Sequence, residues 1–456
     1  MLAITVSLSV LVAASAAAPE QIHIAFGHTP DTMSVQWAVR DNATCSTPST
    51  VQFGADAASL ASEAAGACTP FNLSGQVRSS LHVASLTGLA ASTTYTYRVA
   101  GASDAFAFTT APDAATLAAA LPQRFLVWGD LGSSRSPPAG TSTIMPWASD
   151  EVARGGVSMI LHVGDFAYNF DSDGGEVGAA FMNDIQNMSS TTPYHVSVGN
   201  HEAANDYAHY TEFFRNMPTL TGSVTTDNGV APNNWYYSHN VGLVHFVALS
   251  TEIPFAHPEL AAAQRAWLAA DLAAANKNRS AAPWVIAHGH RSLYCSCDGD
   301  CDESATALRN EWEQLFYEHG VDLFINGHEH NYERMYDVAP AWDAASPWES
   351  GATTRATVDM PATTYIVTGD AGNDENHEPF TRDAPARTAL RTDAYGFSRM
   401  DVHNATHLHW QQVECDFSPD IDDIATGHRV IDDVWLVQHQ HGSFSERAAR
   451  DARPVA

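Results

Sequence analysis

From Phe125 onward the chain repeats one local pattern, in which an apolar run ends in glycine and a polar side chain follows. Because loops at the carboxyl ends of strands converge on one crevice in open α/β sheets, such side chains are delivered to a shared rim. A single Gly-Asp or Gly-His pair is more typical of a turn. Five at successive strand ends predict one site, and they are Gly129-Asp130-Leu-Gly132, Gly164-Asp165-Phe-Ala-Tyr168, Gly199-Asn200-His201-Glu202, Gly289-His290-Arg291 and Gly327-His328-Glu329-His330.

The apolar runs of this part alternate with helical patterns, which predicts a layered α/β domain with a central sheet. Helices are expected at 259–276 and 304–320; in the second, Leu308, Trp312, Leu315 and Phe316 share a face. Buried strands are expected at 125–128, 159–163, 194–198, 243–249, 284–288 and 322–326, and further strands at 364–370, 397–402 and 406–413.

The N-terminal part has a different pattern. Residues 22–110 contain short alternating runs between turn residues, which predict a small antiparallel sandwich. This region has no cluster of acid, base and nucleophile. Residues 111–123 are expected to form a linker or a short helix.

The charge balance limits the partners of the chain. Lys and Arg total 22 and Asp and Glu total 52, so the net charge of the 456 residues is −30 at pH 7. A surface this acidic repels polyphosphate and makes nucleic acid an unfavoured partner. Any site that binds an anion therefore needs strong local positive charge, and the 22 histidines are natural metal ligands.

Residues 1–18 resemble a secretory signal peptide with cleavage near Ala16 to Ala18, although the segment lacks a basic start. A membrane anchor is the alternative, but the apolar run is shorter than the ~20 residues that a span needs. Five Asn-x-Ser/Thr sequons fit a glycosylated, exported protein: Asn42, Asn72, Asn187, Asn278 and Asn404. The C-terminus has no hydrophobic tail that would signal a lipid anchor.

The six cysteines agree with export, because disulfides persist in oxidising compartments. Cys45 and Cys68 are expected to pair. Cys295, Cys297, Cys301 and Cys415 could pair in three ways, among which the sequence does not decide. A zinc site at 295–301 is an alternative, but its spacing matches no usual zinc pattern.

The donors of the repeated motifs suit two metal ions. Two Asp, one Tyr, one Asn and three His are more ligands than one tetrahedral ion uses. Two ions about 3.5–4 Å apart can clamp a phosphate and generate hydroxide near neutral pH. They also provide the positive charge that the acidic chain lacks.

The order GDLG, GDFAY, GNHE, GHRSLY, GHEHNYER resembles the purple acid phosphatases, within the dinuclear metallophosphoesterases. The N-terminal EQIHIAFG…MSVQW and the late VWLVQHQHGSF are also similar to the large enzymes of this family. The resemblance implies an all-β N-terminal sandwich (fibronectin type III-like, 19–112). An α/β metallophosphoesterase domain (120–335), a layered α-β-β-α sandwich, would follow, and then a C-terminal region (360–445).

The resemblance also implies roles for single residues. The ligands of a ferric ion would be Asp130, Asp165, Tyr168 and His330, with Asp165 bridging to a divalent Zn, Mn or Fe ion. Asn200, His290 and His328 would be the remaining ligands of the divalent ion. Hard carboxylate and phenolate suit a trivalent ion, and imidazole and amide suit a divalent one. The catalytic residue His201 would contact phosphate and protonate the leaving alkoxide.

One departure concerns the loop after Gly289-His290-Arg291. Some family members carry a further active-site histidine there, but SLYCSCDGDCDE contains none and is more similar to the loop of the animal-type enzymes. Which group assists His201 is therefore open, with Arg291 and Glu329 as candidates.

The implied function is that of a secreted acid phosphatase, or one of the vacuolar or lysosomal lumen. It would hydrolyse small phosphate monoesters by attack of a metal-bound hydroxide. The alternatives are a dinuclear phosphodiesterase or nucleotidase, and a non-enzymatic binding protein whose sandwich is the working part. The sequence does not decide which ester is the natural substrate or whether the protein forms a homo-oligomer.

Several residues near the motifs have simpler interpretations. His162 is expected to be a core or supporting histidine, and His288 is not expected to be a ligand, because His290 already fills that position. Gly369-Asp370 and Asn376-His377-Glu378 imitate motifs but are expected to be structural or to line the substrate rim. Trp235, Tyr236 and Tyr237 are expected to lie in the core.

Overall fold

The structure is a computed structural model. It describes residues 17–135, 144–218, 234–298, 301–340, 353–415 and 428–451, with backbone only at 301–303. Nearly all of the expected signal peptide lies outside these ranges. No helix in the described ranges is long and apolar enough to cross a bilayer.

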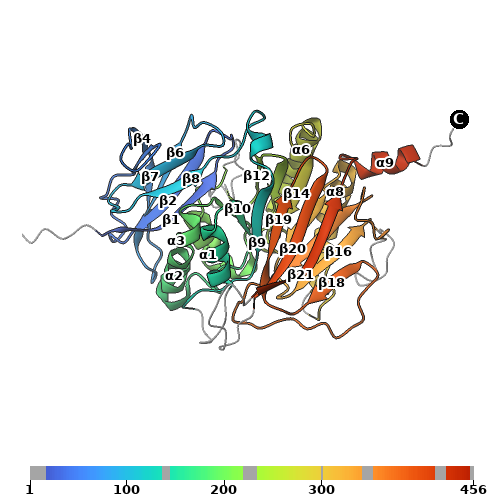
Figure 1. The fold of residues 1–456 in the computed structure, drawn as a ribbon. Coiled ribbons are helices and arrows are strands. Elements are labelled where there is room, and N and C mark those ends of the chain that lie inside the picture. The colour runs from blue at the N-terminus through green and yellow to red at the C-terminus, as the bar shows by residue number, and fades with distance from the viewer. Residues whose placement is uncertain are drawn as a thin grey trace, which may run out of the picture.

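The N-terminal part is the expected antiparallel sandwich, drawn in blue in Figure 1. Its two four-stranded sheets have the orders β1(Pro19–Phe26)-β2(Met33–Val39)-β6(Ser79–Leu86)-β5(Ala67–Phe71) and β4(Ser62–Ala65)-β3(Thr50–Gly54)-β7(Thr94–Val99)-β8(Phe106–Thr109). The predicted Cys45–Cys68 disulfide is confirmed and links β5 to the segment after β2. Cys295 is also disulfide-bonded, and Cys415 is a buried thiol. The 111–123 segment contains a 3-10 turn, Leu117–Ala119, and ends at the first residue of the next strand.

The α/β part contains two facing sheets. The strand pattern alone predicted a single central sheet, which is wrong. The layered α-β-β-α arrangement that the resemblance implied is confirmed. The strands at 123–128, 157–162 and 194–196 pair in one sheet and those at 244–248, 284–288 and 323–326 in the other, and the last strands extend the first sheet antiparallel. The six-stranded sheet is β11(Tyr194–Val196)-β10(Val157–His162)-β9(Gln123–Trp128)-β19(Gly396–Val402)-β20(His407–Cys415)-β21(His428–Val437). The seven-stranded sheet is β12(Tyr237–Val241)-β13(Val244–Ala248)-β14(Trp284–His288)-β15(Leu323–Asn326)-β17(Thr363–Thr368)-β16(Tyr332–Val338)-β18(Thr388–Thr392).

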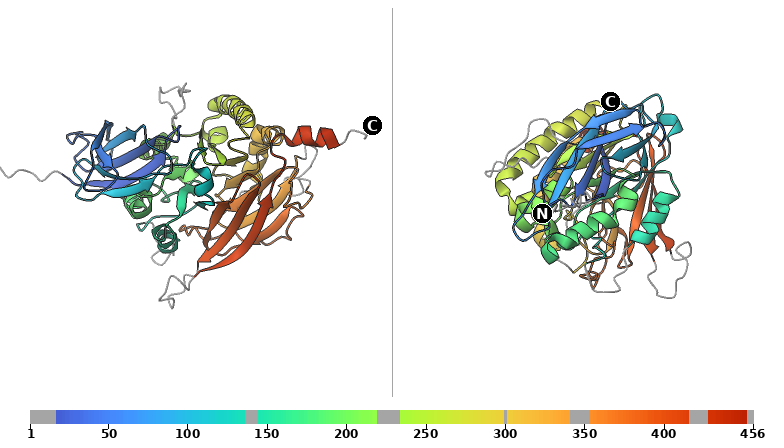
Figure 2. Two further views of the ribbon diagram at one scale, coloured as in Figure 1. Left: turned by 45° about the horizontal axis from the view of Figure 1, so that its top comes forward. Right: turned by 90° about the vertical axis from the view of Figure 1, so that its left-hand side faces the viewer.

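Helices cover the outer face of the seven-stranded sheet and the β9–β11 half of the six-stranded sheet, whereas the outer face of β19–β21 carries no helix among the described residues (Figures 1 and 2). Between the sheets, Phe125 of β9 meets Phe246 of β13, with ring centroids 5.1 Å apart. The six-stranded sheet carries α1(Met145–Ala153), α2(Glu176–Asp184), α3(Gln186–Ser189) and α4(Ala204–Phe213). The seven-stranded sheet carries α6(Pro258–Lys277), α7(Cys301–Leu308), a π-helical turn Arg309–Glu313 and α8(Gln314–His319). The remaining helices are η2(Ser172–Gly175), η3(Asn200–Glu202), α5(Ile253–Ala256) and α9(Phe444–Asp451).

The strand directions place the site. β9, β10 and β11 are parallel, and so are β13, β14 and β15. The carboxyl ends of each set therefore lie at one edge of its sheet. The polar segments after β9, β10, β11, β14 and β15 leave from these edges.

Candidate metal centre

The loops that follow these strands are tightly bent at the predicted ligands. Asp130, Asp165, Tyr168 and His328 have φ of 62°, 51°, 51° and 73°. Residues with a Cβ seldom adopt this left-handed region, and such conformations persist where the surrounding contacts enforce them. These four residues lie in the segments after β9, β10 and β15, and strain of this kind is common at functional sites.

Two of the motif glycines permit a close approach between loops. A Cβ on Gly199 would meet the carboxylate of Asp165, and its backbone nitrogen at 2.6 Å. A Cβ on Gly164, which has φ of 94°, would lie 2.5 Å from Nδ1 of His290. These contacts explain why the polar side chains are preceded by glycine: a larger residue would displace its neighbour's ligand atoms.

Asp130, Tyr168 and His330 form one group of side chains. The Tyr168 hydroxyl donates to Oδ1 of Asp130 at 3.1 Å and lies 2.9 Å from Nε2 of His330. His330 Nε2 is 3.5 Å from the same Asp130 oxygen. Burial and the charge of Asp130 raise the pKa of Tyr168 well above its usual value, so the phenol is protonated without a cation beside it.

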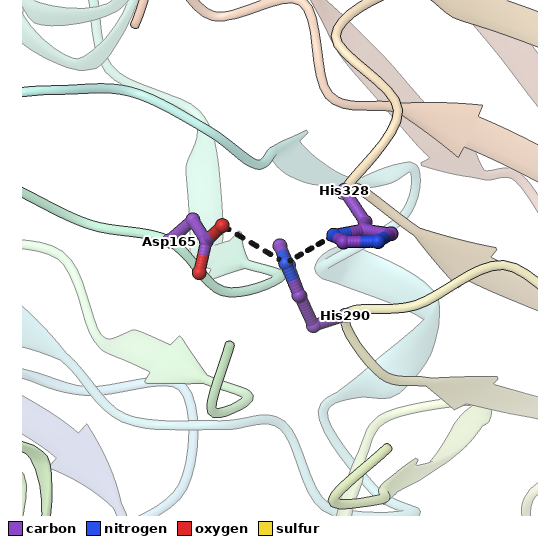
Figure 3. Close-up of side chains that lie close together, drawn as sticks. All are labelled: Asp165, His290 and His328. Carbon is purple, nitrogen blue, oxygen red and sulfur yellow. Dashed lines mark hydrogen bonds and ion pairs between the residues drawn. The ribbon is translucent and has the colours of Figure 1, made fainter. Parts of the chain in front are cut away.

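Asp165, Asn200, His290 and His328 form the second group. Nε2 of His290 lies 3.0 Å from Oδ2 of Asp165 and 3.0 Å from Oδ1 of Asn200. Nδ1 of His328 is 3.2 Å from the same nitrogen. Figure 3 shows Asp165 and His328 on either side of His290, and these three offer donor atoms within 4.8 Å of one another.

The two groups are electrostatically joined. Asp130 also accepts a hydrogen bond from the backbone nitrogen of His328 at 2.9 Å. Burial alone lowers the pKa of His290 and of His330. The Asp165 charge and hydrogen bond outweigh burial at His290 and raise its pKa to about 10, and Asp130 does so at His330, to about 9. The buried carboxylates thus attract positive charge to this edge.

Backbone carbonyls fix the orientation of two imidazoles. Nδ1 of His290 lies 3.0 Å from the carbonyl of Val163, and Nδ1 of His330 lies 2.9 Å from that of Asn376. If each Nδ1–H donates there, each Nε2 is left for a ligand. Glu378 also pairs with His330, at 3.4 Å. The sequence interpretation placed Asn376 and Glu378 only in a structural or rim stretch.

Glu202 is a supporting residue to which sequence reasoning gave no role. Its buried carboxylate accepts from the backbone nitrogens of Asp165, Phe166 and Gly199 at 3.1, 3.0 and 2.9 Å. Burial raises its pKa well above the usual value. Glu202 therefore ties the Asp165 loop to the Asn200 loop, and its position within the third motif was the available signal.

His201 lies at the rim of the site. Its Nδ1 is 3.1 Å from Oδ1 of Asn169, and its ring lies 4.4 Å from that of Tyr168. Nε2 is 3.5 Å from Glu375 and 3.9 Å from Asp165. Asn200, His201 and His328 are partly exposed, whereas the other predicted site residues are buried, so the site opens on their side.

The structure separates the two candidate assistants of His201. The guanidinium of Arg291 lies 3.0 Å from Nε2 of His328, and Glu252 holds its Nε at 3.0 Å. Glu329 is buried, and its carboxylate contacts Sγ of Cys297 at 2.7 Å. Arg291 therefore faces the rim, and Glu329 points into the protein.

The remaining nearby residues have the expected structural places. His162 is buried with Nδ1 2.7 Å from the Tyr194 hydroxyl, and His288 contacts Ser197 at 2.6 Å. Asp370 accepts from Gln412 at 2.7 Å, and burial raises its pKa to about 7. Trp235, Tyr236 and Tyr237 are buried in the core.

The arrangement fits a pair of metal ions. Lone pairs of carboxylate, amide, phenol and imidazole converge, and in the described part of the chain both buried carboxylates form ion pairs only with histidines. Such convergence needs protons or cations between the donors. Carboxylate and phenol gather on one side, and amide and two imidazoles gather on the other, with Asp165 coupled to both.

Comparisons with known proteins agree with this geometry. Residues 123–332 match the calcineurin-like phosphoesterase model, residues 19–110 match the purple acid phosphatase N-terminal domain, and residues 362–423 match the iron/zinc purple acid phosphatase-like protein C. Acid phosphatase type 7 of Homo sapiens is 33% identical over 94% of this chain and 93% of its own length. The Danio rerio protein of that name is 34% identical over 93% and 92%.

More distant relatives extend the match. Purple acid phosphatase 22 of Arabidopsis thaliana is 26% identical over 92% of this chain and 85% of its own length. The fold is similar to the solved purple acid phosphatase PPD1 from yellow lupin, with a TM-score of 0.71 at 18% identity, over 92% of this chain and 75% of that one. The chain therefore belongs to the purple acid phosphatases, acid phosphatases of the dinuclear metallophosphoesterase superfamily.

Proposed function

We propose that this acid phosphatase hydrolyses phosphate monoesters at a centre of one ferric and one divalent ion. The observation that carries the proposal is the convergence of seven donors in two groups coupled through Asp165. When bound, the ions supply positive charge for the phosphate and activate the attacking water. The ferric ion would be held by Asp130, Asp165, Tyr168 and His330, and the Zn, Mn or Fe ion by Asp165, Asn200, His290 and His328.

His201 is the proposed proton donor. It lies on the open side of the site, where the ester must enter, and its Nε2 faces the donor groups. Asn169 holds Nδ1, which fixes the ring plane. When Nε2 of His201 donates its proton to the ester oxygen, the alcohol leaves as a neutral molecule.

Arg291 is the proposed substitute for the histidine that the neighbouring loop lacks. Its guanidinium lies at the partly exposed rim beside His328, and its fork geometry suits phosphate oxygens. Glu252, which is buried, limits where the side chain can move. We therefore assign Arg291 the role of orienting the phosphate.

Export is part of the proposal. The N-terminal segment has the pattern of a secretory signal, and the asparagines of all five sequons are exposed, as glycosylation requires. The destination would be the cell exterior or a vacuolar or lysosomal lumen.

The test compares a monoester and a diester of the same phenol with the wild type and His201→Ala. We expect the wild type to favour the monoester, and His201→Ala to keep both metals while losing about 10²–10⁴-fold in rate. His257→Ala is the matched control, because that histidine is similarly exposed but pairs with Asp206 and Glu259 outside the site. Faster turnover of the diester, or full activity of metal-loaded His201→Ala, would contradict the proposal.

A further inference from the structure

A second group of metal-ligand side chains lies on the outer face of the six-stranded sheet. Asp401 is in β19, His403 follows this strand, and His409 is in β20. One donor atom of each lies within 4.8 Å of the other two. None of the three belongs to the candidate centre described above.

Strand register brings these residues to one face. Asp401 pairs with Arg124 of β9 on one side and with His409 of β20 on the other, and His409 pairs with Trp435 of β21. Directly paired residues of neighbouring strands share a face. The alternate residues Met400 and Leu408 point into the core between the sheets. In Figure 1 the outer face of β19, β20 and β21 is turned toward the viewer.

His409 is oriented as a metal-binding histidine commonly is. Its Nε2 lies 2.8 Å from Oδ1 of Asp433, and Gln411 donates to the other oxygen of that carboxylate at 2.8 Å. If Nε2–H donates to Asp433, the lone pair of His409 is on Nδ1. The ring also stacks on Trp435 at 4.5 Å with an interplanar angle of 10°, which holds its plane.

His403 also packs against the indole of Trp435, next to His409. Its ring centroid is 4.6 Å from that of Trp435 and 6.3 Å from that of His409. The indole thus serves as a platform shared by both imidazoles. Trp435 is 42% exposed and both histidines are partly exposed, so a metal ion can reach the imidazoles from solvent, whereas Asp401 lies at the buried end of the group.

The side chains around the group carry an excess of negative charge, which favours a bound cation. Asp401 accepts two hydrogen bonds from Arg124, each of 2.8 Å, and Glu151 pairs with both Arg124 and Arg399. With Asp433 included, the carboxylates outnumber the guanidinium groups by one. Each carboxylate oxygen has two lone pairs, so an Asp401 oxygen bound to Arg124 can still bind a metal.

The group is remote from the candidate centre. Arg124, beside Asp401, is six residues before Asp130 in the chain, and the intervening residues belong mostly to β9. At about 3.3 Å per residue, this separation is roughly 20 Å. An ion at one place cannot share ligands with the other.

We propose that Asp401, His403 and His409 bind one divalent transition ion, a third metal in addition to the pair at the catalytic edge. Two imidazoles and a carboxylate favour Zn²⁺ or Cu²⁺ over Mg²⁺ or Ca²⁺. Three protein donors leave the remaining coordination positions to water. The site requires nothing from the catalytic residues.

The test titrates Cu²⁺ into purified protein whose catalytic metals are already in place, with equilibrium dialysis and tryptophan fluorescence as readouts. We expect one additional bound ion and quenching of fluorescence, because Trp435 contacts both histidines. His403→Ala and His409→Ala should each weaken this binding at least about tenfold. Trp435→Phe should keep the ion in dialysis and lose most of the quenching.

His439→Ala is the matched control. This histidine is 53% exposed and pairs with Asp359 rather than with the group. Its variant should bind Cu²⁺ like the wild type, and all variants should keep phosphatase activity and thermal midpoint. Equal Cu²⁺ binding by wild type, His403→Ala and His409→Ala would overturn the proposal, as would an equal loss in His439→Ala.

Discussion

Backbone strain and glycine placement are the residue-scale features that most closely define the edge with the candidate metal centre. Left-handed conformations at residues such as Asp130 and His328 cost about 1–3 kcal/mol each, and the folded loops retain them. Glycine precedes several of these side chains because two loops approach there with no space for a Cβ. These locally strained positions therefore orient donor atoms toward the candidate metal centre.

Gly199→Ala tests this point. The added methyl group would collide with Asp165, the residue that couples the two donor groups. We expect about a hundredfold loss of phosphatase rate, since a displacement of about 1 Å can have that effect, together with lower metal content by elemental analysis. Gly155→Ala is the control: unlike Gly199, which is extended, Gly155 has a left-handed φ of 82° that strains alanine, but no atom lies within 4 Å of the new methyl group. Unchanged metal content and rate in Gly199→Ala would disprove this role for the glycine.

The sequence indicated the central residues of the site but not their supports. The five motifs at strand ends can be recognised in the sequence, because each combines glycine with side chains that can bind a metal ion. Contacts such as Asn376 to His330, or Glu252 to Arg291, join residues 46 and 39 positions apart and leave no local pattern. Predicting them requires the packing of whole loops.

At the scale of elements, apolar runs predicted the strands that are buried on both faces. β16 was not singled out, because its buried residues include Glu333 and Arg334, and Arg334 is neutralised by Asp432 of β21. β4 was also not singled out, because it is a short, mostly exposed edge strand. Charge pairing and edge position are set by tertiary structure, which a hydrophobic pattern does not contain.

The sandwich and the catalytic part are joined by specific hydrogen bonds. Backbone nitrogens of Ile22 and Phe26 in β1 donate to Gln186 at 2.8 Å and to His195 at 3.0 Å. The hydroxyl of Tyr97 in β7 donates to the carbonyl of Ser190 at 2.7 Å in a buried setting. These contacts indicate that the sandwich stabilises the catalytic part.

Tyr97→Phe measures one of these contacts. It would leave the buried Ser190 carbonyl without this donor, so we expect the free energy of unfolding to fall by about 1–3 kcal/mol. Chemical denaturation measures the change. Tyr95→Phe, which removes a hydroxyl that accepts from Ala90 near the surface, should have a smaller effect. If the two variants lost equal stability, the domain contact would not have the weight assigned to it.

For the molecule as a whole, buried neutral histidines link stability to pH. Burial lowers the pKa of His195 to about 3 and that of His23 to about 4. Above about pH 6.5 these groups are neutral in both folded and unfolded chains and have no effect. As pH falls below 6.5, the unfolded chain takes up protons that the folded chain does not, until the folded pKa is reached.

We therefore expect the free energy of unfolding to fall between pH 6.5 and pH 4, by up to about 1.4 kcal/mol per pH unit for each such histidine. Denaturation at pH 7, 6 and 5 measures the slope. His23→Gln should reduce the slope of the unfolding free energy against pH by the contribution of about one proton. A slope that His23→Gln does not alter would contradict this account.

The catalytic account depends on two ions at one edge of paired sheets, and a visible spectrum with elemental analysis of the exported protein tests it most directly. We expect two metal ions per chain, at least one of them iron, and a broad absorption band in the green from the Tyr168 phenolate on ferric iron. Tyr168→Phe should lose the colour. A colourless wild-type protein with full phosphatase activity, or one metal ion or none per active chain, would contradict the central claim.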